Sequence, residues 1–244
     1  MNTGASRNDI PARERLIFAM DVADADAARR LAERLGDSVG FYKVGLELFM
    51  AGGYFELLEW MVGHGKRVFV DLKFFDVPAT VAAAVSRLRN RGVAFTTVHG
   101  NQAMMEAAAA AKGDVKVLAV TVLTSLDRGD LDDLGFACDV GQLVLSRARR
   151  ALEAGCDGVV SSGLEAAMLR QHLDRRLLVV TPGIRPVENR PADDQKRTVD
   201  VAQAFANGAD YIVVGRPIRD AVDPRAAAES IQDTIAGIFG RTTA

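Results

Sequence analysis

The sequence of 244 residues has little cysteine, little histidine and no long apolar segment, and each shortage excludes a class of protein. The 2 cysteines, Cys138 and Cys156, are too few for a disulfide framework, and neither belongs to a C-x-x-C pair. The 3 histidines are scattered and show no zinc-ligand spacing, so we expect no metal site. No apolar run approaches the ~20 residues of a membrane-spanning helix, so we expect no membrane segment.

An excess of charge of one sign is also missing. Lysine and arginine number 30 against 32 aspartates and glutamates, and no basic block occurs, which argues against binding to a nucleic acid polymer. A local basic pocket for a small phosphate remains open. Residues 1–14 are polar and lack the apolar core of a signal peptide. We therefore expect a flexible tail over residues 1–14 and a cytoplasmic protein.

What the sequence does contain is a regular alternation of short β-branched runs and longer runs with helical periodicity. Strands are expected at 16–20, 41–45, 68–73, 94–99, 115–123, 158–161, 177–181 and 211–215. Helices are expected at 24–35, 53–64, 79–91, 102–111, 140–154, 165–173, 199–206 and 226–239. About eight βα units in ~250 residues close a (β/α)₈ barrel. An open doubly wound sheet is the alternative, but it usually carries a glycine-rich turn after its first strand, and residues 21–24 hold no glycine. We predict one α/β domain, a TIM barrel over residues 15–241.

Charged residues stand at the ends of the first three predicted strands, where barrel enzymes place their chemistry. The first strand ends in Asp21, the second carries Lys43, and the third ends with Asp71 and Lys73. Asp71 and Lys73 are two residues apart, so both side chains point to one face of the strand. One such pair is explained equally well by a salt bridge that closes the barrel mouth. Two carboxylates and two ammonium groups from three strands favour a prearranged field for a reaction that moves charge.

Basic and glycine residues follow the last two predicted strands and indicate a phosphate site. Gly215 lets the backbone approach an oxyanion, and Arg216 can donate paired hydrogen bonds to it. The long loop 182–198 is a candidate lid with basic and amide side chains, namely Arg185, Arg190, Gln195, Lys196 and Arg197. The plainer interpretations are an exposed arginine at a helix start and a solvated surface loop.

The combination of these motifs resembles the orotidine 5′-phosphate decarboxylase family over about residues 16–239. The most specific element is D-x-K-x-x-D followed by an apolar residue and proline, at residues 71–78. The supporting elements are Ala19-Met20-Asp21, Lys43-Val44-Gly45, Leu123-Thr124-Ser125, Thr181-Pro182-Gly183-Ile184-Arg185, Asp194-Gln195-Lys196-Arg197 and Val213-Val214-Gly215-Arg216. The departures are Val77, where isoleucine is more usual, and Gly100, where alanine is expected. Neither position carries a charged group.

The resemblance implies a decarboxylase that converts orotidine 5′-phosphate to UMP in pyrimidine biosynthesis with neither cofactor nor metal. It implies that Lys73 protonates C6 of the pyrimidine after electrostatic stabilisation of a carbanion there. Asp71 would flank that lysine, and so would Asp76, reaching in from the partner subunit of a homodimer with shared active sites. The remaining implied substrate contacts are Lys43 and Asp21 at the ribose, Thr80 across the subunit boundary, Thr124 and Ser125 near the pyrimidine, Pro182, and Arg185, Gln195, Gly215 and Arg216 at the phosphate.

Two other functions share part of this pattern. A metal-dependent phosphosugar enzyme of the same barrel type, such as a keto-gulonate phosphate decarboxylase or hexulose phosphate synthase, resembles the 71–76 stretch. It uses an acidic metal ligand where this sequence has Lys43, and it lacks Thr124 and Ser125 in this setting. A non-catalytic phosphoribosyl-binding barrel has no reason to keep both lysines with Asp71 and Asp76.

Overall fold

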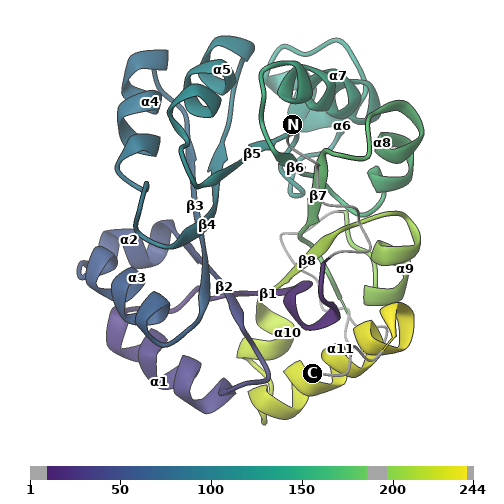
Figure 1. Ribbon diagram of the computed structural model, residues 1–244. Coiled ribbons are helices and arrows are strands. Elements are labelled where there is room, and N and C mark those ends of the chain that lie inside the picture. The colour runs from purple at the N-terminus through teal and green to yellow at the C-terminus, as the bar shows by residue number, and fades with distance from the viewer. Residues whose placement is uncertain (1–9, 186–196, 241–244) are drawn as a thin grey trace.

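The computed structural model describes residues 10–185 and 197–240, and within these residues eight strands form a closed barrel inside a ring of helices (Figure 1). The strands are β1 (Leu16–Ala19), β2 (Phe41–Gly45), β3 (Arg67–Phe74), β4 (Val93–Val98), β5 (Lys116–Val120), β6 (Gly158–Val160), β7 (Leu178–Thr181) and β8 (Tyr211–Val214). Each strand pairs in parallel with the next, and β8 closes onto β1 with Leu16 opposite Ile212. The predicted TIM barrel is confirmed.

Helices follow the strands and cover the outside of the barrel (Figure 1). One helix of each βα unit packs on the barrel, namely α1 (Ala25–Leu35), α3 (Tyr54–Gly63), α4 (Pro78–Ser86), α5 (Gln102–Ala111), α7 (Val140–Glu153), α8 (Ala166–His172), α9 (Val201–Ala206) and α11 (Pro224–Phe239). All of them had been predicted. The expected end of α4 at residue 91 is wrong, because turns occupy residues 87–92 up to Gly92, whose φ is 72°.

Three short helices were not predicted: α2 (Leu46–Ala51), α6 (Arg128–Asp133) and α10 (Arg216–Arg219). Each lies in a loop after a strand and has at most 6 residues. Such lengths display a helical period only weakly in the sequence. The predicted strand 115–123 is also shortened, because the β5 ladder ends at Val120 although the apolar run continues to Leu123.

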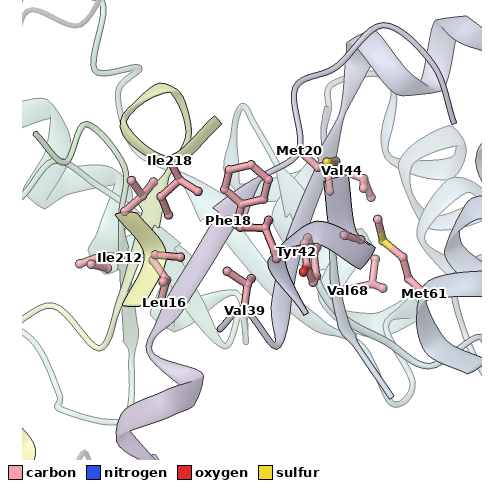
Figure 2. Close-up of a cluster of buried hydrophobic side chains, with 14 of the residues drawn as sticks. Leu16, Phe18, Met20, Val39, Tyr42, Val44, Met61, Val68, Ile212 and Ile218 are labelled. Carbon is pink, nitrogen blue, oxygen red and sulfur yellow. The ribbon is translucent and has the colours of Figure 1, made fainter. Parts of the chain in front are cut away.

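Side chains on the strands alternate between two buried layers, which is why the strands show near-continuous apolar runs. Leu16 and Phe18 point outward and pack against the surrounding helices, in the cluster that Figure 2 shows. Ile17 and Ala19 point inward. The strands of an α/β barrel are thus buried on both faces.

Aromatic rings fill the N-terminal end of the barrel interior. Phe41 and Tyr211 are the first residues of β2 and β8, and both rings pack against Phe95, with centroid distances of 5.1 Å and 5.2 Å. Small inward residues such as Ala19 and Val213 follow toward the C-terminal ends of the strands. The barrel is therefore plugged at one end and hollow at the other.

Residues 10–14, before the predicted barrel boundary at residue 15, are within the described structure. A 3₁₀ helix, η2 (Ala12–Glu14), packs against α11, and Ala12 is buried. Glu14 forms an ion pair with Arg67 at the start of β3. Residues 1–9 of the expected tail lie outside the described residues. No helix in the described part of the chain is long and apolar enough to cross a membrane.

Candidate active site

A cavity of about 560 Å³ opens at the C-terminal ends of the strands, the hollow end of the barrel. Its wall contains ten of the residues that the sequence singled out, namely Asp21, Lys43, Asp71, Lys73, Thr124, Ser125, Pro182, Arg185, Gly215 and Arg216. The structure thus brings together residues that are up to about 195 positions apart in the chain, because parallel strands present all their carboxyl ends at one face.

Four charged side chains alternate in sign across the floor of this cavity. Lys43 Nζ lies 3.2 Å from Asp21 Oδ1 and 3.6 Å from Asp71 Oδ2. Lys73 Nζ lies 3.0 Å from both carboxylate oxygens of Asp71. The order Asp21, Lys43, Asp71, Lys73 therefore places each inner charge between two opposite charges, and we call these four residues the charge array.

The position of Lys73 depends on an irregularity in β3. The pairing of β3 with β4 shifts register between Val70 and Phe74, and Lys73 has a φ of 48°, in the left-handed region. For a non-glycine residue that conformation costs about 1 kcal/mol, and such residues are found mainly at functional sites. The predicted common face for Asp71 and Lys73 is confirmed, but the backbone reaches it through a bulge.

A threonine on β4 that the sequence did not single out holds this bulge in place. The Lys73 backbone N–H donates to Thr97 Oγ1 at 2.9 Å, and the Thr97 hydroxyl donates to Asp71 Oδ1 at 2.9 Å. Thr97 is fully buried. Because one hydroxyl bonds both to the backbone of the lysine and to the neighbouring carboxylate, it fixes the two groups relative to each other. A buried threonine in a β-branched strand gives no separate signal in the sequence.

Burial and charge act in opposite directions on the inner members of the array. Burial favours the neutral form of Asp71, but Lys43, Lys73 and hydrogen bonds from Lys73 and Thr97 outweigh it and lower the pKa of Asp71. Burial likewise favours a neutral Lys43, but Asp71 and Asp21 outweigh it and raise the pKa of that lysine. Both groups are therefore ionised at neutral pH.

Arginines gather at the side of the cavity formed by β7 and β8. Arg185 and Arg216 line the cavity, as predicted, and Arg219 on α10 lines it as well. Arg219 donates to the backbone oxygen of Asp21 at 2.8 Å and so ties α10 to the end of β1. A Cβ built on Gly215 would come within 3.4 Å of Ala19 Cβ, so a side chain here would enter the cavity wall. This side offers cationic donors to an anion.

Sequence reasoning missed several wall residues besides Arg219, among them Glu47 and Ser161. Glu47 and Arg219 lie on the short helices α2 and α10, which were themselves not predicted. Ser161 directly follows β6, and its position at a strand end was the available signal.

Two of the predicted site residues in the described part of the chain do not line this cavity. Asp76 is exposed, and its Oδ1 accepts from the backbone N–H of Val77 at 2.6 Å. Thr80 is exposed on α4. Gln195 lies outside the described residues. Within the described residues no group of three or more histidine, cysteine, aspartate or glutamate side chains could hold a metal ion.

Comparisons with known proteins place this geometry in a family. The sequence model of the "Orotidine 5'-phosphate decarboxylase / HUMPS family" matches residues 14–231. The orotidine 5′-phosphate decarboxylase of Methylococcus capsulatus is 66% identical over 234 residues, covering 96% of this chain and 97% of the relative. That of Stenotrophomonas maltophilia is 54% identical, covering 95% of this chain and 97% of the relative.

A solved structure agrees with these sequence relatives. The crystal structure of orotidine 5′-phosphate decarboxylase from Lactobacillus acidophilus superposes with a TM-score of 0.79 at 34% sequence identity, covering 91% of this chain and 99% of that one. Sequence and fold agree over nearly the whole chain. The chain therefore belongs to the orotidine 5′-phosphate decarboxylase / HUMPS family.

Proposed function

We propose that this protein decarboxylates orotidine 5′-phosphate to UMP in pyrimidine biosynthesis, with the barrel over residues 15–241 as its catalytic domain. The observation that carries the proposal is the charge array, which lies in one cavity with Arg185 and Arg216. An anionic phosphate needs the arginines, and a carbanion needs an ammonium group close to the carbon that loses CO₂. The relatives that carry this name at 66% and 54% identity support the same substrate.

In the proposed reaction the bond between C6 and the carboxylate carbon breaks, CO₂ departs, and the electron pair stays on C6. The Lys73 ammonium stabilises this charge and then donates a proton to C6, and solvent reprotonates the lysine. Asp71, 3.0 Å from Lys73 Nζ, holds that ammonium in position through charge-assisted hydrogen bonds. The atoms and electrons of this reaction balance without an external oxidant or reductant. The charged side chains of the protein are therefore sufficient for the proposed step.

The other wall residues orient the substrate. Asp21 and Lys43 bind ribose hydroxyls, Thr124 and Ser125 contact the pyrimidine, and Pro182 closes the wall next to Arg185. Gly215, Arg216 and Gln195 complete the phosphate site. Binding energy from the phosphate, which is remote from C6, serves to orient the reacting carbon against Lys73.

We further propose a homodimer in which Asp76 and Thr80 complete the partner's active site. Asp76 stands between two exposed apolar side chains, Phe75 at 66% and Val77 at 61% exposure. Large apolar side chains exposed beside a charged residue are typical of an interface rather than of a free surface. A second copy of this chain is the occupant that gives Asp76 a chemical role, because Asp76 does not reach its own cavity.

A metal-dependent phosphosugar enzyme of the same family is the second candidate. The specific observation against it is Lys43, whose Nζ lies within 3.6 Å of both Asp21 and Asp71 and so neutralises the carboxylates that would hold a cation. We place the reaction in the cytoplasm, where the free Cys138 and Cys156 would stay reduced.

One absorbance assay tests this function. Purified protein is mixed with orotidine 5′-phosphate, with and without excess chelator, and the conversion to UMP is followed. We expect rapid conversion that the chelator does not change. Loss of activity with chelator would favour the metal-dependent enzyme, and no conversion in either sample would favour a non-catalytic barrel.

A further inference from the structure

The carbonyl oxygens of the backbone that follows β5 are bound by arginines, although the Thr121 N–H still donates to the Val160 oxygen of β6 at 3.1 Å. Guanidinium groups donate to three successive carbonyl oxygens: Arg147 to Thr121 at 2.5 Å, and Arg197 to Val122 at 3.1 Å and to Leu123 at 2.9 Å. The next two residues in the chain are Thr124 and Ser125, which line the cavity. The direction in which this turn presents its side chains therefore depends on how those peptide units are oriented.

Arg197 is buried and is itself held by a carboxylate. Its side chain is 10% exposed, and its Nη1 lies 2.7 Å from Oε1 of Glu165, whose side chain is 12% exposed. Removing one partner of such a buried pair leaves an uncompensated charge, so the two residues depend on each other. Neither residue is among those that line the cavity in the described part of the chain.

Arg197 also joins three of the loops at the mouth of the barrel. Its side chain bonds to the loop after β5 and to Glu165 in the loop after β6. Its own backbone lies two residues before Val199, which bridges to Ile184 beside the Pro182 and Arg185 wall. A planar guanidinium with donors in a fixed fork can serve a carboxylate and two carbonyls at once, whereas a lysine ammonium cannot.

We propose that Arg197, held by Glu165, is a positioning residue that sets the Thr124–Ser125 turn against the pyrimidine. The inference rests on the proposed function, because it assigns a role in the same cavity. Arg197 acts through the turn and touches no substrate. Its loss should therefore lower catalysis only to the extent that Thr124 and Ser125 contribute to it.

The protein offers a matched control at the opposite end of the barrel. Arg170 is equally buried, lies 2.5 Å from Asp210, and donates to the backbone oxygens of Leu177 and Gly208 at 2.8 Å each. Leu177 and Asp210 directly precede β7 and β8, so this arginine stands at the N-terminal ends of the strands, away from the cavity. Arg170 thus pairs with a carboxylate and two backbone oxygens, as Arg197 does, but it does not contact the Thr124–Ser125 turn.

The test combines kinetics with a double-mutant cycle. We expect Arg197→Ala to lower kcat/KM for orotidine 5′-phosphate by about tenfold or more, but to cost less than about threefold in a Thr124→Ala background, since interacting residues are not additive. Arg197→Lys should behave like Arg197→Ala, because one ammonium cannot replace the fork. Arg170→Ala should lower the melting temperature while leaving kcat/KM within about twofold of wild type at temperatures where it is folded.

Two results would overturn the positioning role: equal kinetic losses for Arg197→Ala and Arg170→Ala, or additive losses for Arg197→Ala and Thr124→Ala. If Arg197→Ala does not fold, the double-mutant cycle with Thr124→Ala is measured with Arg197→Lys and with Glu165→Gln instead. A wild-type protein that does not turn over orotidine 5′-phosphate would instead refute the proposed function. An active wild type with unaffected Arg197 variants refutes the positioning role alone.

Discussion

At the scale of single residues, one carboxylate holds the charge array together. Asp71 accepts hydrogen bonds from Lys73 and Thr97 and lies 3.6 Å from Lys43 Nζ. Its side chain is 11% exposed, so these partners replace most of the water that a free carboxylate would bind. The two lysines can stand close together in the cavity only because this anion lies between them.

Removing the ammonium of Lys73 tests its chemical role. We expect Lys73→Ala to fold and to lose more than about 100-fold in kcat, the usual loss on deleting one group that stabilises the transition state. Steady-state kinetics checks this, with Lys112→Ala as the control, because Lys112 also pairs with a carboxylate, Asp157, at 2.8 Å outside the cavity. Activity of Lys73→Ala within about tenfold of wild type would contradict the role.

Removing the charge of Asp71 tests how much its ion pairs contribute to the free energy of unfolding, and how that contribution depends on pH. Its pKa lies below the ordinary 3.8, so ionised Asp71 contributes stability that is fully present above 3.8 and is lost as the pH falls through the lowered value. We expect Asp71→Asn to be less stable by about 3 kcal/mol at neutral pH, because Lys73 then loses its carboxylate partner and Lys43 keeps only Asp21.

Urea unfolding at a series of pH values checks this prediction. The difference between Asp71→Asn and wild type should stay constant above the ordinary carboxyl range and narrow below it. Asp133→Asn, at an exposed aspartate, is the control and should change stability little at any pH. A difference that widens toward acid would show that the pKa of Asp71 is raised rather than lowered.

Arg216 is predicted to act on the phosphate alone. We expect Arg216→Ala to lower kcat/KM for orotidine 5′-phosphate by about 10- to 100-fold, the loss of charge-assisted hydrogen bonds to one anion. The unphosphorylated nucleoside should be affected by less than about threefold. Both substrates are compared in one assay, with Arg149→Ala as an exposed-arginine control. Equal losses on both substrates would assign Arg216 a role other than phosphate binding.

At the scale of elements, the sequence predicted every strand of the barrel because each is a continuous apolar run between helices of clear period. The end of β5 was misplaced because residues 121–123 are as apolar as the strand, while their carbonyls bond to arginines distant in the sequence. The helices α2 and α10 were missed, and with them Glu47 and Arg219 of the cavity wall. The local sequence pattern therefore predicts the strands and the main helices of the barrel well, but it predicts the short helices in the loops poorly.

The predicted site residues likewise differ in whether local sequence pattern or tertiary structure sets their position. The ten that line the cavity lie near the carboxyl ends of strands or in the loops after them, and the fold brings these strand ends together whatever the loops do. Thr97 was missed because a buried threonine looks like packing, and the left-handed φ of Lys73 is a tertiary property of a bulge. Asp76 and Thr80 are exposed and do not line the cavity of their own chain, and Gln195 lies outside the described residues.

Gly158 lies where β6 has no room for a side chain between β5 and β7. A Cβ at this position would lie 2.6 Å from the backbone oxygen of Leu178 and 2.8 Å from Leu118 Cδ2, so β6 would have to move away from β7. We expect Gly158→Ala to lower the free energy of unfolding by about 1–3 kcal/mol. Gly237→Ala on α11 has no neighbour within 4 Å and should raise it by about 0.5–1 kcal/mol. Chemical denaturation measures both, and the same sign for both variants would contradict the packing argument.

At the scale of the whole molecule, a closed barrel brings the chemistry of distant residues to one face but leaves Asp76 outside its own cavity. Pro78 begins α4 directly after this turn, and Val77 before it is extended, with ψ 147°. The side chains of this turn, Phe75, Asp76 and Val77, are all exposed. If a second copy receives this turn, the interface must be isologous, because the same patch gives and receives the aspartate.

Mixing two inactive variants tests this shared site. In a heterodimer of Lys73→Ala with Asp76→Ala, one site carries both lesions, while the other combines the intact Lys73 of one chain with the intact Asp76 of its partner. Activity should therefore return on subunit exchange, toward about a quarter of wild type when equal amounts mix at random, since half of the dimers then hold one intact site. Each variant mixed with itself is the control and should stay inactive. If native mass spectrometry shows exchange but activity does not return, Asp76 acts within its own chain, and the C₂ arrangement loses its chemical basis.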